Sequence, residues 1–202
     1  MNITLGITGA SGIPIAFTLL KELLAVSTTS RVNLIITQAG MITIKQESDI
    51  SLSINPNQTK DILVAQLKLS NSNNLHVYTN NDWYSPVASG SSVSDAMVIC
   101  PCSMATLGKI ASGIGDDLLC RSADVVLKER RNLVIVPRET PLNAIHLANM
   151  QRLAELGVAI VPPVPAFYTH PKSVDDIIKF IVSRILDQLR IENNISPRWS
   201  SK

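Results

Sequence analysis

The sequence predicts an α/β fold in which a doubly wound parallel sheet carries helices on both faces. Short apolar runs alternate with amphipathic segments along most of the chain, which is the pattern of a parallel sheet buried on both sides. The length of 202 residues suits one domain, and no linker or internal repeat divides it. Hydrophobic residues make up 46% of the chain and charged residues 17%, so we expect a folded globular protein, residues 1–202 forming a single domain.

Apolar runs of six to eight residues predict the strands. Runs of this length with few polar interruptions are typical of strands that are covered on both faces. Pro101 is expected to end the third of them. The predicted strands are residues 2–8, 32–37, 96–101, 132–137 and 158–165.

Helices are predicted between the strands from apolar periodicity and from residues that typically begin or end a helix. Ser11, Ser103 and Ser173 stand where N-caps are expected, and Gly157 stands where a helix ends. The predicted helices are residues 13–25, 103–112, 117–131, 141–157 and 173–189, with weaker helical patterns at 41–47 and 59–69.

The residues that follow each strand are the candidate site, because parallel sheets bind ligands beyond the carboxyl ends of their strands. The turn after the first strand has glycines at positions 6, 9 and 12, which differs from the G-x-G-x-x-G dinucleotide motif. Thr37 and Gln38 end the second strand, where that motif needs an acidic residue to hold a ribose. A dinucleotide site is therefore excluded. A mononucleotide phosphate and a Ser11-capped turn without a ligand both remain open.

Polar residues also follow the later strands. Ser103 and Thr106 begin the next helix, either as ligand contacts or as an ordinary cap. Arg138 and Glu139 follow the fourth predicted strand, where the cation suits a phosphate and a salt bridge at the rim is the alternative.

Further cations and hydroxyls lie on helices and loops. Arg121 and Lys128 are seven residues apart and share one helix face, but Asp124 between them makes a surface ion-pair ladder the simpler explanation. Tyr168 follows the last predicted strand, and Arg184 lies on the last helix. Each of these two, taken alone, is better explained as structural.

Composition excludes several classes of function. A net charge of +2 gives no indication of nucleic-acid binding. We find no signal peptide and no apolar run near the ~20 residues of a membrane span, and we expect a cytoplasmic protein. The three cysteines, without metal-ligand spacing, suit a reducing compartment and predict no metal site. Trp199 indicates that the tail, residues 191–202, docks at the active site or on a neighbouring subunit.

Several segments together resemble the UbiX-type flavin prenyltransferases, a branch of the flavin-binding cysteine-decarboxylase-like fold with a Rossmann- or flavodoxin-like sheet. The matching segments occur in the family's order and cover nearly the whole chain. The most specific are ADVVLKERR, PRETPL and PPVPAFY, and the others are GITGASG, NDW with ASGSS, MVICPCSMATL and PRW.

The resemblance implies a reaction in which the dimethylallyl group of dimethylallyl monophosphate is joined to N5 and C6 of reduced FMN, without a metal. The implied product, prenylated FMN, is the cofactor of UbiD-type decarboxylases, including one of ubiquinone biosynthesis. The resemblance also implies a homo-oligomer, a dodecamer, whose neighbouring subunits share each active site.

The resemblance assigns roles to individual residues. Thr37 stands where a serine is usual and keeps its hydroxyl, whereas Gln38 replaces a common lysine and is assigned no role. The implied FMN contacts are Gly9, Ala10, Ser11, Thr37, Ser103, Met104, Ala105, Thr106 and Arg138. The implied dimethylallyl phosphate contacts are Gly90, Lys128, Tyr168 and Arg184. The implied catalytic residues are Ser11, Glu47, Arg121, Lys128, Glu139 and Trp199.

Two other functions remain open at this point. One is a flavin-dependent cysteine decarboxylase of the same fold, against which the segments PCSMAT and RETPLN favour the prenyltransferase branch. The other is a non-catalytic flavin carrier or partner subunit, which would have no need of the cations Arg121, Lys128 and Arg184.

Overall fold

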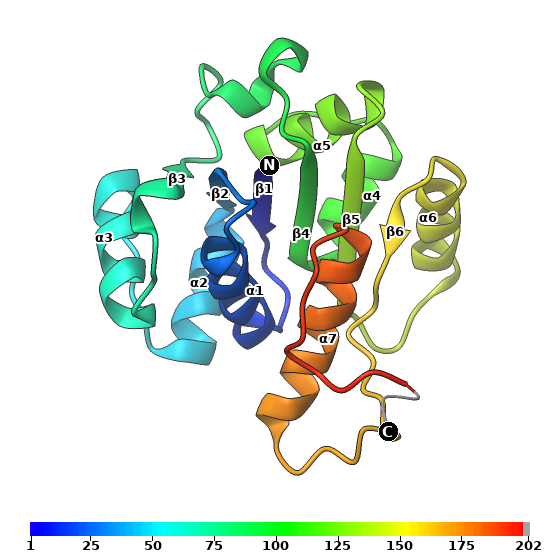
Figure 1. Cartoon of the computed structure of the whole chain (residues 1–202). Coiled ribbons are helices and arrows are strands. Elements are labelled where there is room, and N and C mark those ends of the chain that lie inside the picture. The colour runs from blue at the N-terminus through cyan, green and yellow to red at the C-terminus, as the bar shows by residue number, and fades with distance from the viewer. Residues whose placement is uncertain (200–202) are drawn as a thin grey trace.

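A six-stranded parallel sheet with the order β3-β2-β1-β4-β5-β6 forms the centre of the computed structural model, which describes residues 1–199 (Figure 1). The strands are β1 (Asn2–Ile7), β2 (Arg31–Ile36), β3 (Leu75–Tyr78), β4 (Ala96–Cys102), β5 (Asn132–Pro137) and β6 (Ala159–Ile160). The chain order reverses between β1 and β4, so the loops that follow these two strands diverge and leave room for a ligand. The predicted doubly wound α/β fold is confirmed.

Helices cover both faces of this sheet. Within the described residues they are α1 (Ile13–Ala25), α2 (Gln38–Ser48), α3 (Pro56–Leu67), α4 (Met104–Ala111), α5 (Leu118–Lys128), α6 (Ala144–Glu155) and α7 (Val174–Gln188). One hydrophobic cluster joins α1 and α7 to one face, and a second joins α4, α5 and α6 to the other. None of the helices in residues 1–199 combines the length and the apolar character that a membrane span needs.

The alternation of side chains along β1 shows how the two clusters are built. Ile3, Leu5 and Ile7 are fully buried in the cluster with α1 and α7. Gly6 faces the opposite side, where a Cβ atom would lie 2.9 Å from Cδ1 of Leu119 on α5. The first glycine of the turn motif therefore lets a helix pack closely on the sheet.

The structure corrects several predicted boundaries. The edge strand β3 was not predicted, α2 and α3 each begin three residues earlier than expected, and α6 begins three residues later. The predicted strand at 158–165 shrinks to β6, because prolines at 162 and 163 cannot donate ladder hydrogen bonds. Pro101 does not end β4, since its carbonyl still accepts a hydrogen bond from the backbone N–H of Thr8 at 3.2 Å.

Candidate active site

The turn after β1 is held by a carboxylate from α2. Gly12 is the N-cap of α1 and provides no side-chain hydrogen bond. Instead, Oε2 of Glu47 accepts hydrogen bonds from the backbone N–H groups of Gly12 at 3.0 Å and Ile13 at 2.9 Å. The prediction that Ser11 caps this helix is therefore wrong, because Glu47 occupies the donors that a cap would take.

The environment of Glu47 favours its charged form. Partial burial acts to raise the pKa of Glu47. Hydrogen bonds from the Ser11 hydroxyl and the two backbone N–H groups act in the opposite direction, as does the nearby Arg138 guanidinium. Their sum places the pKa of Glu47 below its usual value, so the structure brings Ser11, Glu47 and Arg138 together around one carboxylate.

A threonine links the loops that follow β1 and β4. The Thr8 hydroxyl donates to the carbonyl of Pro101 at 2.8 Å and accepts from the backbone N–H of Ser103 at 2.7 Å. Thr8 is fully satisfied and buried, and it fixes the start of α4 beside the Gly9–Ser11 turn. Sequence analysis assigned Thr8 no role, although a polar residue at the end of a buried strand was the available signal.

Hydroxyl groups cap the starts of α2 and α4 and can still donate a hydrogen bond. Thr37 caps α2 by accepting from the backbone N–H of Gly40 at 3.0 Å, and Ser103 caps α4 by accepting from that of Thr106 at 3.3 Å. The Ser103 and Thr106 hydroxyls also share a hydrogen bond of 3.0 Å. The Thr37 hydroxyl therefore keeps its hydrogen for a ligand, whereas the Ser103–Thr106 pair uses one of its two hydroxyl hydrogens internally and keeps one to donate.

Close packing places the Gly9–Ser11 backbone directly on α2. A Cβ atom at Gly9 would lie 2.5 Å from Cβ of Ala39, and one at Gly40 would lie 2.7 Å from the carbonyl oxygen of Ile7. Both glycines are therefore needed for the approach of α2 to the β1 turn.

Arg138 and Glu139 lie at the carboxyl end of β5. The backbone N–H of Arg138 donates to the carbonyl of Cys102 at 3.1 Å, while the side chain is exposed. Glu139 accepts from the backbone N–H of Thr140 at 3.1 Å. Among the residues described, these two side chains form no ion pair with each other, so the rim salt bridge considered above is not found.

The donors gathered at this edge fit FMN. Hydroxyls of Ser11, Thr37, Ser103 and Thr106 suit the carbonyls and ring nitrogens of a flavin, and an exposed guanidinium at Arg138 suits its phosphate. Met104 and Ala105 stand in the first turn of α4 and leave their side chains only partly covered. We call this surface, beyond the carboxyl ends of β1, β2, β4 and β5, the polar ledge. It carries the hydroxyls of Ser11, Thr37, Ser103 and Thr106 and the Arg138 guanidinium, with the partly covered side chains of Met104 and Ala105 beside them.

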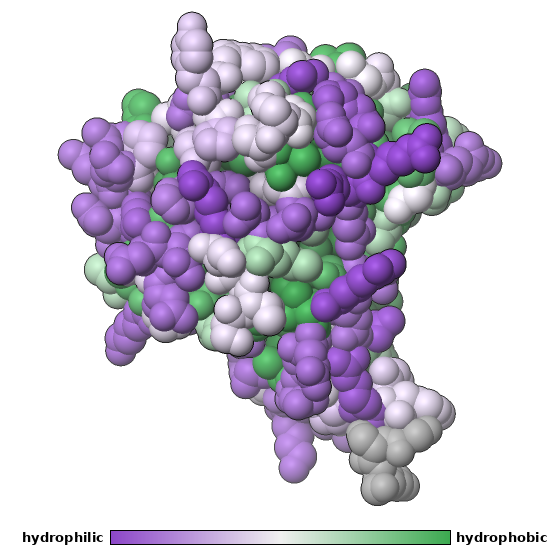
Figure 2. Space-filling view, turned by 45° about the horizontal axis from the view of Figure 1, so that its top comes forward, coloured by the Kyte–Doolittle hydropathy of each residue, from purple (hydrophilic) through white to green (hydrophobic). Residues whose placement is uncertain are grey.

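Gly90 and Lys128 lie at the amino-terminal ends of the strands, opposite the polar ledge. Gly90 comes just before β4, and Lys128 ends α5 just before β5, whereas the ledge follows the carboxyl ends of the strands. The six residues of β5 separate the amino-terminal from the carboxyl-terminal ends of the strands by about 20 Å. Figure 2, in which the upper end of Figure 1 comes forward, shows mainly hydrophilic side chains with hydrophobic areas exposed between them.

Lys128 and Gly90 contact each other at these amino-terminal ends. A Cβ atom at Gly90 would clash with Oε1 of Glu129 and lie 2.6 Å from Nζ of Lys128, so a larger residue there would displace the ends of these two exposed side chains. Lys128 pairs with Glu129, and Arg121 pairs with Asp124 at 2.8 Å while its Nε donates to the carbonyl of Ala88 at 3.2 Å. The expected ladder through Asp124 therefore includes Arg121 but not Lys128.

Tyr168, Arg184 and Trp199 form a third group beside α7. The rings of Tyr168 and Trp199 meet edge to face with centroids 4.9 Å apart. Arg184 donates to Asp187 at 2.7 Å and lines a hollow of about 410 Å³ whose other walls are mostly apolar. The tail therefore contacts its own chain up to Trp199, and residues 200–202 of the predicted docking segment lie outside the described part.

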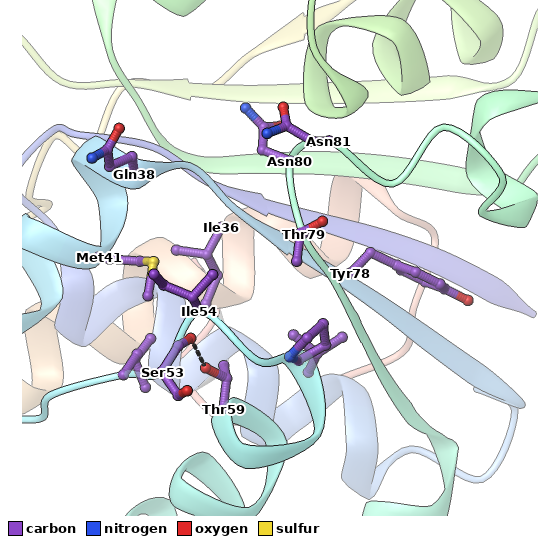
Figure 3. A pocket seen from close by; sticks show the side chains of 13 residues that line it. Ile36, Gln38, Met41, Ser53, Ile54, Thr59, Tyr78, Thr79, Asn80 and Asn81 are labelled. Atoms are coloured by element: carbon purple, nitrogen blue, oxygen red, sulfur yellow. Dashed lines mark hydrogen bonds between the residues drawn. The ribbon is translucent and has the colours of Figure 1, made fainter.

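A separate apolar pocket of about 240 Å³ lies beyond the ends of β2 and β3 (Figure 3). In Figure 3, Ile36, Met41 and Ile54 gather in one part of the pocket, while the ring of Tyr78 on β3 extends away from them. None of the predicted FMN contacts lines this pocket. The polar ledge is thus distinct from it.

One group of potential metal ligands occurs among residues 1–199, formed by Asp116, Asp117 and Cys120. Nζ of Lys109 already donates to both carboxylate oxygens of Asp116 at 2.9 Å. Asp117 caps α5 through the backbone N–H of Cys120 at 2.8 Å. These acidic residues have structural partners, so the group carries no argument for a metal.

Comparison with known proteins gives the family. The Flavoprotein family model matches residues 1–186. The flavin prenyltransferase UbiX of Methanocaldococcus jannaschii is 46% identical over 201 residues, covering 100% of both chains. UbiX of Pseudomonas aeruginosa is 43% identical over 201 residues, covering 100% of this chain and 95% of the relative. This chain belongs to the UbiX family.

Solved structures of UbiX-family proteins have the same fold. A dodecameric FMN-dependent UbiX-like decarboxylase from Escherichia coli O157:H7 matches with a TM-score of 0.86 at 39% identity, over 100% of both chains. AnUbiX (PadA1), in complex with FMN and dimethylallyl pyrophosphate, also matches with a TM-score of 0.86, at 38% identity over 100% of this chain and 98% of that one. The FMN-dependent cysteine decarboxylase TvaF matches with a TM-score of 0.56 at 19% identity, which shows the shared fold alone.

Proposed function

We propose that this UbiX-family chain is a flavin prenyltransferase that joins the dimethylallyl group of dimethylallyl monophosphate to N5 and C6 of reduced FMN. The observation that carries the proposal is the identity of 43–46% with UbiX flavin prenyltransferases over essentially the full length. The match spans the whole chain and so covers the loops at both ends of the strands, where the proposed chemistry would take place.

The ledge after β1, β2, β4 and β5 would hold the flavin. When bound there, reduced FMN supplies the nucleophilic N5 and C6 positions. Backbone groups of Gly9 and Ala10, the hydroxyls of Thr37 and Thr106, and the first turn of α4 would orient the ring. The exposed Arg138 would neutralise the FMN phosphate.

Cations would drive the departure of the phosphate from the dimethylallyl substrate. The bond between the allylic carbon and the phosphate oxygen breaks with its electron pair on the phosphate, so groups that stabilise this charge favour the reaction. Lys128 and Arg184 would supply positive charge, and Tyr168 and the Gly90 backbone would complete the cradle. Arg121, Glu139 and Trp199 would be further catalytic residues of the assembled site.

Ser11 and Glu47 would handle the proton at N5. The lowered pKa of Glu47 keeps its carboxylate charged near neutral pH, so it can accept a hydrogen bond from Ser11 and hold that hydroxyl in one orientation. Ser11 would then pass a proton between the flavin and Glu47. The departing phosphate is a second acceptor.

Completion of the site requires a second copy of the chain. Lys128 and Gly90 lie about 20 Å from the ledge of their own chain, so they would serve the ledge of a neighbour. The UbiX-like neighbour from E. coli is dodecameric, and we propose the same assembly here. The product would be passed to a UbiD-type decarboxylase, in ubiquinone biosynthesis or in aromatic acid decarboxylation. Three unpaired, buried cysteines suit the proposed cytoplasmic location.

The test is to incubate the protein anaerobically with reduced FMN and dimethylallyl monophosphate and to extract the flavin for mass spectrometry. The proposal predicts a flavin heavier by one C5 unit, and recovery of unmodified FMN alone would refute it. A cysteine decarboxylase would instead oxidise a cysteinyl peptide, and a flavin carrier would do neither.

A further inference from the structure

Asp187, near the end of α7, holds several polar groups at once. Its Oδ2 accepts from Nη1 of Arg184 at 2.7 Å and from Nη1 of Arg198 at 2.6 Å. Its Oδ1 accepts from Nη2 of Arg198 at 2.8 Å and from the Asn193 amide at 3.1 Å. The Asp187 carboxylate thus joins Arg184 of the helix to Arg198 of the tail, which lies eleven positions after Asp187.

The two guanidinium groups are held differently. Arg198 uses both of its terminal nitrogens on both Asp187 oxygens, which is the bidentate geometry that fixes a side chain most firmly. Arg184 gives Asp187 one donor, and its side chain is 49% exposed. Arg184 is therefore oriented by Asp187 and lines the adjoining hollow.

The contact with Arg198 also determines where Trp199 lies. Trp199 is the next residue, and its ring meets that of Tyr168 with centroids 4.9 Å apart at 85°. Tyr168 also contacts Phe180 of α7, with ring centroids 6.0 Å apart. Trp199 is otherwise 73% exposed, so packing alone does not fix its position.

We propose that Asp187 is a positioning residue for the dimethylallyl phosphate half of the site, orienting Arg184 directly and holding Trp199 against Tyr168 through Arg198. This inference rests on the proposed function, in which Tyr168, Arg184 and Trp199 serve the substrate. Two guanidinium groups around one carboxylate leave a net positive charge, as a site for a phosphate needs.

The position of Asp187 supports a role beyond helix stability. An acidic residue in the last turn of a helix meets the negative end of the helix dipole, which is unfavourable without cations beside it. Here Arg184 and Arg198 offset this effect, and both lead to the proposed substrate residues.

The test uses Asp187→Asn in a Trp83→Phe background, where Trp199 is the remaining one of the two tryptophans. Loss of a charge-assisted hydrogen bond predicts a KM for dimethylallyl monophosphate raised roughly tenfold, with the FMN affinity within about twofold of the parent. Trp199 emission is expected to shift to longer wavelength and to become more accessible to acrylamide. Asp187→Glu should restore part of both properties.

Asp175→Asn is the matched control, because Asp175 pairs with Lys179 in the first turn of α7 at 2.7 Å and touches no tail residue among those described. It should change neither the KM nor the emission. If Asp187→Asn does not fold, Arg198→Gln replaces it and must free Trp199 in the same way. Unchanged Trp199 emission in a folded variant, or an equal loss of FMN and substrate affinity, would overturn the proposal. Failure of the wild-type protein to make prenylated flavin would instead refute the proposed function, while the emission of Trp199 still tests the Asp187 contact.

Discussion

Oε2 of Glu47 lies 3.0 Å from the backbone nitrogen of Gly12 and accepts its hydrogen bond, so a residue of α2 closes the N-terminal end of α1. The same oxygen accepts from Ile13 at 2.9 Å. A helix N-terminus in this type of fold commonly receives a ligand phosphate. Here a carboxylate of the chain already accepts from these two N–H groups, so they are not available to a phosphate.

Removal of the Glu47 carboxylate should destabilise the fold. Glu47→Ala leaves the N–H groups of Gly12 and Ile13 without their acceptor, and loss of such a cap costs about 1 kcal/mol. Urea unfolding measures the difference. Gln46→Ala, at an exposed position on the same helix, is the control and should be nearly neutral. Equal stabilities of the two variants would show that Glu47 does not act as a cap.

The stabilisation by Glu47 should depend on pH. Its pKa is lower in the folded chain than the ordinary value of 4.5, so its charged form is favoured by folding. The contribution is then complete above the unfolded-state pKa and is lost as the pH falls through the folded-state pKa. The stability difference between the wild type and Glu47→Gln should therefore shrink below pH 4.5. A difference that stays constant or grows on acidification would contradict this assignment.

Gly9→Ala should disturb the turn where the flavin is proposed to lie. The new methyl group would approach Cβ of Ala39 to 2.5 Å, and overpacking of this kind costs about 1–3 kcal/mol. We expect a lower melting temperature and weaker FMN retention. Gly108→Ala within α4 is the control, since the nearest atom to its new Cβ would be Nδ2 of Asn149 on α6, 3.4 Å away, and helix propensity predicts a gain of about 0.5–1 kcal/mol. A Gly9→Ala protein as stable as the wild type would show that α2 can move away.

Most of the fold was predictable because local signals agreed with the tertiary structure. The limits of α1 and β5 were predicted without error, since buried apolar runs and helix-starting residues mark them. β3 was missed because its four residues, LHVY, include a histidine and lie at the sheet edge, where the apolar signal is weak. The pairing of β3 with β2 defines it as a strand, and this pairing exists only in the folded chain.

The proposed site residues were predicted from the resemblance more than from local residue patterns. The cap formed by Glu47 on Gly12 joins residues 35 positions apart, and no local rule connects them. The Asp187–Arg198 pair was missed for the same reason. Gly90 and Lys128 both precede strands, so the order of the elements already places them away from the polar ledge.

The cations at the two ends of the strands should have separable effects. Lys128→Ala should impair the use of dimethylallyl monophosphate more than FMN retention, because Lys128 is assigned to the substrate phosphate. Arg138→Ala should impair FMN retention first. Lys179→Ala, which removes a surface ion pair with Asp175, is the control cation. Steady-state KM values and flavin titrations provide the comparison. If both variants lose substrate affinity and FMN affinity to the same extent, the assignment of Lys128 to the substrate and Arg138 to FMN is wrong.

The central claim is that each active site combines the ledge of one chain with Lys128 of another. The direct test is to co-express Lys128→Ala and Arg138→Ala chains, each inactive or nearly so alone, and to assay the mixed oligomers for prenylated flavin. Random assembly predicts that about one site in four has an intact ledge facing an intact lysine, so activity should return to about a quarter of the wild type. Mixed oligomers no more active than the separate variants would show that each site lies within a single chain.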